Sequence, residues 1–263
     1  MVHTLTGLVV ESEAESTTHT VVPSRRRRSR RSLGGHSPIL LLHYDFWLEA
    51  IDEKHRYGFH LRAFHELWKR EMADASPVND ADRSFFYWLD HGNGSRIELP
   101  HCDRNALNAT RVQYCTVPQR RQFEVEFNST QLTYAESHVP VQTDALSKWI
   151  FVLSQDDRLY VARKRKGFFH HSSFLGGVPV VAAGKIYVAD GKVYAIEPHS
   201  GHFKPRLESV TAVCRVLEAH GVDSHRVHFI KPRKWKDPWP FSDAPHETVE
   251  EADIVSDSED SGE

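Results

Sequence analysis

The sequence predicts an α+β fold, a single globular domain in which helices flank a largely antiparallel sheet. Runs with alternating apolar and polar residues, typical of half-buried strands, fill the chain between about residues 110 and 198. Before and after them, apolar residues recur at spacings of three and four, which indicates amphipathic helices. Asp190-Gly191 separates two of the alternating runs and predicts a tight antiparallel hairpin. Consecutive strands bounded by helices favour an α+β arrangement.

The composition divides the chain into three regions. Its 263 residues and 40% hydrophobic content are enough for one sizeable core, which we assign to residues 37–241. Residues 1–36 form an arginine-rich tail and residues 242–263 an acidic tail. We expect both tails to be disordered, because they contain too little apolar surface to offset the entropy that ordering would cost.

The net charge of −3 conceals two clusters of opposite sign. Residues 25–31 contain six arginines, whereas residues 247–263 contain eight carboxylates and no Lys or Arg. Without these clusters and three glutamates near the N-terminus, 27 basic and 25 acidic residues remain, so the core lacks the charge of a specific nucleic-acid surface. The arginine cluster has three interpretations that stay open: a nuclear localisation signal, a patch for an anionic partner, or a solvated linker.

Cysteine usage and the absence of targeting patterns bear on the compartment. Cys102, Cys115 and Cys214 form no Cys-x-x-Cys pair, so neither a disulfide framework nor a cysteine zinc site is indicated. No apolar run approaches the roughly 18 residues of a membrane span, and the N-terminus carries glutamates where a signal peptide would be basic and then apolar. We therefore expect a cytoplasmic or nuclear location, or both, and no membrane partner.

The predicted helices and one predicted strand come from apolar spacing. Residues 59–72 should form an amphipathic helix, and residues 209–220 a second helix that Gly221 terminates. The dense aromatic run at residues 84–89 reads as a buried strand, followed by a turn-prone loop at residues 90–94.

The remaining strands come from alternation. Residues 123–127 alternate apolar and acidic side chains and should form a half-buried strand, with Asn128-Ser-Thr as the turn after it. Residues 149–153 and 159–161 should pair as one hairpin, and residues 185–189 and 192–196 as another. The stretch from 232 to 241 should run extended along the core, anchored by Trp235 and Trp239.

Candidate site residues gather between residues 167 and 205, where histidines and serines lie among glycine-bracketed apolar runs. The predicted hairpin would fold residues 199–202 back toward residues 170–173, so that both could line one pocket. Imidazoles can act as general acid and base, and hydroxyls as nucleophiles or ligand donors. The candidates are His171, Ser172, Ser173, Ser200 and His202. If residues 170 and 171 lie on a strand, only one can face the pocket, and we choose His171. The alternative is that these residues only satisfy turns and the core.

No standard catalytic motif supports one reaction. The sequence has no Gly-x-Ser-x-Gly elbow, no His-Glu-x-x-His, no phosphate-binding glycine loop and no convincing metal-ligand set, so the cofactor is unknown and no metal is assigned. Arg56 and Lys148 are candidates for binding a phosphate- or carboxylate-bearing ligand or cofactor, although each could equally be a surface or salt-bridging group.

Six sequence blocks resemble one family. In the same order as here, they resemble the plant IQM family of IQ-motif-containing calmodulin-binding proteins and its fungal relatives, over about residues 40 to 230. The blocks are Asp-Glu-Lys-His-Arg-Tyr-Gly ending at Gly58, Phe-Phe-Tyr-Trp-Leu-Asp ending at Asp90, Lys-Trp-Ile-Phe-Val-Leu-Ser starting at Lys148, His-Ser-Ser-Phe-Leu starting at His171, Ala183-Gly184 and Ser-Gly-His starting at Ser200.

The resemblance implies calmodulin as a partner, but it identifies neither a calmodulin-binding segment in this sequence nor a reaction. In the plant proteins, calmodulin binding is attributed to an Ile-Gln-x-x-x-Arg-Gly helix ahead of this core, and this sequence contains no such segment. Residues 25–31 could attract acidic calmodulin only by charge. One hypothesis is an intracellular signalling or stress-related interaction module with another protein partner and a small-ligand pocket. The other is an uncharacterised enzyme, such as an ADP-ribosyl-type or other transferase, with a His/Ser site.

Overall fold

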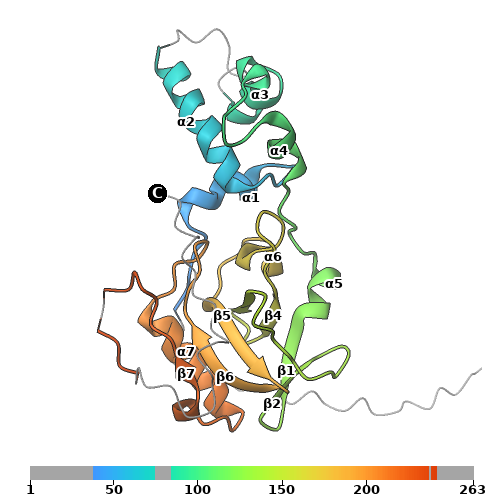
Figure 1. Ribbon diagram of the computed structural model, residues 1–263, viewed down its shortest axis with the longest axis vertical. Helices are drawn as coiled ribbons and strands as arrows, with labels where there is room; N and C mark the ends of the chain where they lie inside the picture. Colours follow the sequence, from blue (N-terminus) through green and yellow to red (C-terminus); the bar gives the residue numbers. More distant parts are fainter. Residues whose placement is uncertain (1–37, 75–83, 237, 242–263) are drawn as a thin grey trace, which may run out of the picture. The chain divides into compact units, whose positions relative to one another are not determined.

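One sheet of seven strands organises the described part of the chain, with the order β2-β1-β4-β3-β5-β6-β7. Figure 1 draws these strands as arrows and the helices as coiled ribbons. The computed structural model describes residues 38–74, 84–236 and 238–241. The arginine cluster and both predicted tails lie entirely outside these residues. The strands are β1 Glu124–Asn128, β2 Gln131–Tyr134, β3 Trp149–Leu153, β4 Leu159–Arg163, β5 Ala182–Ala189, β6 Lys192–Glu197 and β7 His228–Phe229. All pair antiparallel except β6 with β7, so the predicted α+β fold with a largely antiparallel sheet is confirmed.

The predicted hairpins are present. β3 pairs with β4, and β5 pairs with β6 across Asp190 and Gly191, whose φ angles of 46° and 72° are the left-handed values that this turn needs. The strand predicted at residues 123–127 is β1, and the turn at Asn128-Ser-Thr connects it to β2.

Each face of the sheet covers its own apolar cluster, because successive strand residues point to opposite sides. Phe151 and Leu153 of β3 face the larger cluster, to which α7 (Leu207–Ala219) contributes. Ile150 and Val152 face the other cluster, which contains Phe174 of α6 (His171–Leu175). Trp235 and Trp239 pack against the larger cluster as predicted, and the Trp239 Nε1–H donates to the Phe229 carbonyl.

Helices form a third cluster of buried residues. Leu61 and Phe64 of α2 pack with Trp88 and Leu89 of α3 and Leu107 of α4. The helices predicted at residues 59–72 and 209–220 correspond to α2 and α7 and are confirmed. None of the helices in the described residues is long and apolar enough to cross a membrane. The remaining elements are η1 Tyr44–Phe46, α1 Trp47–Ile51, α2 Gly58–Asp74, α3 Phe85–Asp90, η2 Asn93–Arg96, α4 Arg104–Ala109, α5 Val117–Arg120, η3 Arg121–Phe123 and η4 Ser224–Arg226.

Two segments differ from the predicted strands. The aromatic run predicted as a buried strand is helix α3, because Phe85, Trp88 and Leu89 then share one face against the helical cluster. The residues after His170, also expected on a strand, form the short helix α6, which ends at Gly176 with a left-handed φ of 65°. Residues 170 and 171 therefore do not point to opposite faces of a strand, and both line the pocket described below, contrary to the expectation that only one would.

Candidate ligand pocket

A pocket of about 240 Å³ is lined by residues of η1, of the start of α2, and of the segments that follow β4 and β6. The α2 side contributes Phe59 and Arg62, and the segment after β4 contributes Lys164 and Lys166. The other lining residues are Phe46, Tyr57, Ile150, His170, His171, Lys185, His199, Ser200, Gly201 and His202. The predicted approach of residues 199–202 to residues 170–173 is therefore confirmed.

Four aromatic and imidazole rings follow one another along the pocket lining. The rings of Phe46 and His202 stack with centroids 3.8 Å apart, and the His202 and His170 centroids are 5.1 Å apart. The His170 ring in turn lies nearly parallel to Tyr57 at 5.4 Å. Because these rings support one another, their positions are set before any ligand enters.

The buried carboxylate of Glu49 lies next to one of these rings, that of His202. Glu49 of α1 has no exposed surface, and its carboxylate accepts hydrogen bonds from the Gly58 N–H at 3.0 Å and the Tyr114 hydroxyl at 3.2 Å. Burial and the nearby Glu49 charge raise the pKa of Tyr114 far above its usual range. His202 Nε2 lies 3.4 Å from Glu49 Oε1, within ion-pair distance but without hydrogen-bond geometry. Glu49 thus joins α1 to the start of α2 and to the segment after β6 that carries His202.

His171 lines the pocket as a neutral group. Burial lowers its pKa well below the usual value, and the nearby positive charge of Lys164 acts in the same direction. His171 Nε2 lies 3.1 Å from the carbonyl oxygen of Gly184. Because that carbonyl can only accept, Nε2 carries the proton and Nδ1 is left as an acceptor.

The charged side chains lining the pocket are all basic. Arg62, Lys164, Lys166 and Lys185 are accompanied by four histidines, and none of the pocket-lining residues in the described ranges is acidic. Carboxylates approach from outside the lining, since Lys185 pairs with Glu197 at 3.0 Å and Arg62 with Asp45 at 3.7 Å. Burial alone would raise the pKa of Glu197, but His199 and Lys185 outweigh it and lower that pKa. The lining itself suits an anion.

Of the predicted catalytic candidates, three line the pocket and two contact residues in or next to it. His171, Ser200 and His202 line the pocket, together with His170, which the sequence analysis did not select. Ser172 and Ser173 are not among the lining residues and are fully buried. The Ser172 hydroxyl donates to Glu49 at 3.3 Å, and the Ser173 hydroxyl accepts from the His170 N–H at 2.9 Å. These two contacts hold the pocket rings and their support in place.

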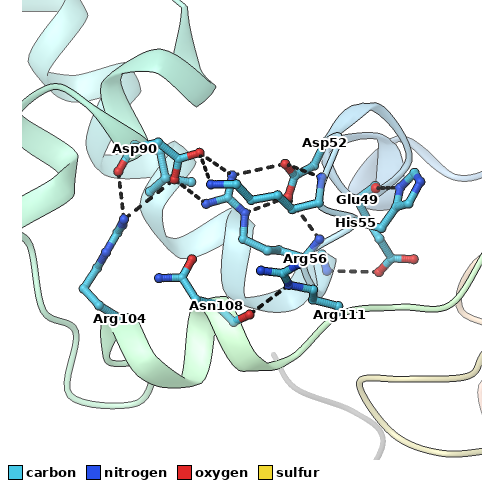
Figure 2. A network of polar contacts seen from close by, with 11 residues as sticks. Glu49, Asp52, His55, Arg56, Asp90, Arg104, Asn108 and Arg111 are labelled. Atoms are coloured by element: carbon cyan, nitrogen blue, oxygen red, sulfur yellow. Dashed lines mark hydrogen bonds and ion pairs between the residues drawn. The ribbon is translucent and has the colours of Figure 1, made fainter.

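The two basic residues proposed for ligand binding lie elsewhere. Arg56 is completely buried, and its guanidinium lies 2.7 Å from Asp52 and 2.6 Å from Asp90. Figure 2 shows its side chain between these two carboxylates. Burial lowers the pKa of a guanidinium, but the bonds to these carboxylates outweigh it and raise the pKa of Arg56. Lys54 and Arg104 also approach Asp90. Neither Arg56 nor Lys148 lines the pocket, so any role in ligand binding stays a prediction.

Sequence reasoning missed Glu49 and the basic residues of the pocket. Lys164 and Lys166 belong to an uninterrupted basic run that begins at Arg163, directly at the end of β4, and this run was the available signal. Glu49 and Arg62 carried no comparable signal, because each is one charged residue in a helix. Within residues 38–74, 84–236 and 238–241, no group of three or more His, Cys, Asp and Glu residues is placed to hold a metal ion.

The fold and pocket define a class: an α+β domain with a preformed cavity lined by rings and basic groups. Residues 119–210 match the family model described as the IQ motif-containing protein middle domain. The chain is 38% identical over 175 residues to the IQ domain-containing protein IQM5 of Arabidopsis thaliana, covering 66% of this chain and 34% of the relative. For IQM1 of the same plant, identity is 37% over 177 residues, covering 67% and 35%.

A third Arabidopsis relative, IQM3, is 34% identical over 192 residues, covering 71% of this chain and 40% of the relative. The chain therefore contains an IQM-family core, and the resemblance seen in its six sequence blocks is confirmed. It spans about a third of the length of the first curated relatives that it matches. No solved structure matches the chain.

Proposed function

We propose that this IQM-type core is an intracellular signalling or stress-related interaction module whose pocket binds a small phosphate- or carboxylate-bearing ligand. The observation that supports the proposal is the lining of the pocket, which holds four Lys or Arg side chains and no carboxylate. Grouped cations repel one another, and an anion with two or more charges would relieve that repulsion. The pre-stacked rings reduce the ordering cost of binding.

Titration calorimetry with tripolyphosphate and with citrate tests this proposal. We expect one of these anions to bind the wild-type protein, and the Lys164→Gln, Lys166→Gln double variant to lose at least ten-fold in affinity. Lys192→Gln is the matched control, because Lys192 is an exposed lysine of β6 outside the pocket. If neither these nor larger anions bind, or if all three proteins bind equally, the anionic-ligand proposal is wrong.

We also propose a cytoplasmic or nuclear location, and that any contact with calmodulin arises through charge alone. Deleting residues 25–31 should reduce nuclear accumulation of a tagged protein if the cluster is a localisation signal. Without an anchored apolar helix, binding to calmodulin should be absent, or weak and lost as salt screens the charges. A tight, calcium-dependent complex that persists at high salt would contradict this expectation.

An enzymatic alternative is supported by one observation. His202 and Ser200 line the same pocket, and His202 has the buried carboxylate of Glu49 within 3.4 Å, an arrangement that could hold an imidazole for proton transfer. Incubation with labelled NAD and mass spectrometry of the products would detect ADP-ribosyl transfer, in which nicotinamide leaves as the acceptor bond forms. If His202→Gln abolishes this transfer but leaves NAD binding unchanged, the enzymatic alternative is favoured over the interaction module.

A further inference from the structure

We propose that the anion is part of a nucleotide: the pocket takes a ligand that joins a planar base to a chain of phosphates. This inference rests on the proposed function, because it assumes that the basic lining binds an anion. It goes beyond it by naming the class of ligand. The pocket combines a basic part with an aromatic part, and an inorganic anion would use only the basic part.

The size of the pocket is the first argument. The pocket volume of about 240 Å³ is many times the roughly 10–15 Å³ of cavity that one water molecule needs. Orthophosphate, with five heavy atoms, would leave much of this space unfilled. A ligand with several connected groups fits the volume better, with its remainder at the open mouth.

The aromatic side chains are the second argument. Phe59 lines the pocket, and 47% of its surface is exposed. Arg62 lies three residues later on α2, so both side chains share one face of the helix. Tyr57, also in the lining, has its ring centroid 6.2 Å from that of Phe59. A phenyl ring next to a guanidinium provides a stacking surface for a base and a cation for its phosphates.

The neutral histidine is the third argument. His171 presents Nδ1 as a hydrogen-bond acceptor, because its Nε2–H faces the Gly184 carbonyl. A neutral acceptor does not pair with a phosphate oxygen, but it pairs with a ribose hydroxyl or an amino group of a base. The lining therefore offers cations for phosphates, a ring for stacking and an acceptor for a polar N–H or O–H group.

Calorimetry on the full chain tests the inference with tripolyphosphate, adenosine and the four common ribonucleoside triphosphates. We expect at least one triphosphate to bind ten-fold or more tightly than tripolyphosphate. Phe59→Leu should reduce that affinity about ten-fold while leaving tripolyphosphate within two-fold. Phe59→Trp should retain tight binding, since it keeps an aromatic face. Phe168→Leu is the control, because Phe168 is 46% exposed and lies outside the lining.

The possible failures are separable. If tripolyphosphate binds and no nucleoside triphosphate binds more tightly, the nucleotide inference is overturned while the anion proposal stands. The same holds if Phe59→Leu weakens both ligands equally while its melting temperature is unchanged. If adenosine alone binds, or if no ligand in the panel and no citrate binds, both proposals fail.

Discussion

Arg56 and Arg62 lie six positions apart but belong to two different kinds of charged cluster. Arg56 has no exposed surface, and two carboxylates hold its guanidinium at 2.7 and 2.6 Å. The Arg62 side chain is 53% exposed and faces a pocket whose lining contains only basic charges. In the first cluster the carboxylates contact the guanidinium directly inside the core, whereas at the pocket the carboxylates of Asp45 and Glu197 pair with Arg62 and Lys185 from outside the lining. This contrast separates a structural role from a ligand-binding one.

The comparison also explains why a sequence block can be read wrongly. Arg56 belongs to one of the six family-like blocks, and its charge made it a candidate for binding a phosphate. The structure shows that its donors are already used by Asp52 and Asp90. A basic residue indicates a ligand site only when its neighbours leave its charge to be compensated from outside.

The largest effect should come from breaking the buried ion-pair cluster of Arg56, Asp52 and Asp90. Arg56→Met should reduce the free energy of unfolding by about 3–5 kcal/mol, because it leaves two carboxylates without their buried partner. Arg62→Met, the matched variant from the pocket, should change it by less than about 0.5 kcal/mol, as a surface substitution does. Urea denaturation at pH 7 measures both. Equal losses for the two variants would remove the distinction.

The next largest effect should come from adding a side chain at Gly184, whose carbonyl oxygen contacts His171. A Cβ at Gly184 would lie 2.9 Å from Phe151 Cε1 and closer still to the Glu197 carbonyl oxygen. Gly184→Val should therefore cost at least about 1–3 kcal/mol, the usual range for overpacking, since backbone cannot move aside as a side chain can. Gly201→Ala is the control, because its nearest neighbour would be 3.7 Å away. A stable Gly184→Val protein would contradict the close approach.

A smaller effect should appear on acidification. Because the pKa of His171 is well below 6.5 in the folded protein, only the unfolded chain binds a proton there as the pH falls through 6.5. Stability is therefore full above that pH and falls below it, by up to about 1.4 kcal/mol per pH unit. Denaturation at pH 7.5 and 5.5 should show a shallower loss for His171→Gln than for the wild type. Parallel losses would mean that other groups dominate.

The smallest effect should come from removing one pocket cation without ligand. Lys166→Gln should leave the free energy of unfolding within about 0.5 kcal/mol of the wild-type value, because Lys166 is exposed among like charges. Denaturation at low and high salt measures the change. A loss above 1 kcal/mol at low salt would mean that carboxylates of the protein itself neutralise Lys166, as they do Arg56.

Much of the fold could be predicted from the sequence, because its signals are local. Alternation identified β1, and the Asp190-Gly191 turn identified the hairpin of β5 and β6. The error at residues 85–90 has a physical cause. A short apolar run fits a buried strand and a buried helix equally well, and only the cluster it packs against decides between them. The spacing of Phe85, Trp88 and Leu89 was the helical signal.

The site was less predictable, because its parts come from separate elements. The hairpin brought His171 and His202 to one pocket, as the sequence indicated. The charge of the pocket depends on Arg62 from α2, Lys164 and Lys166 after β4, and Lys185 from β5. Which side chains of distant elements meet, and which are already paired, depends on tertiary packing. Composition reports only a nearly neutral core, in which this basic lining is averaged away.

The carboxylate of Glu49 has a consequence for folding. Its contact with Ser172 spans 123 residues, and the contact between His43 and Lys204 spans 161. Contacts this distant in sequence close large loops, and such closure is slow compared with forming a hairpin. We expect the β5–β6 hairpin to form early in refolding and the pocket late. A bound ligand would then hold together two segments of the chain, one before the sheet in sequence and one after most of its strands.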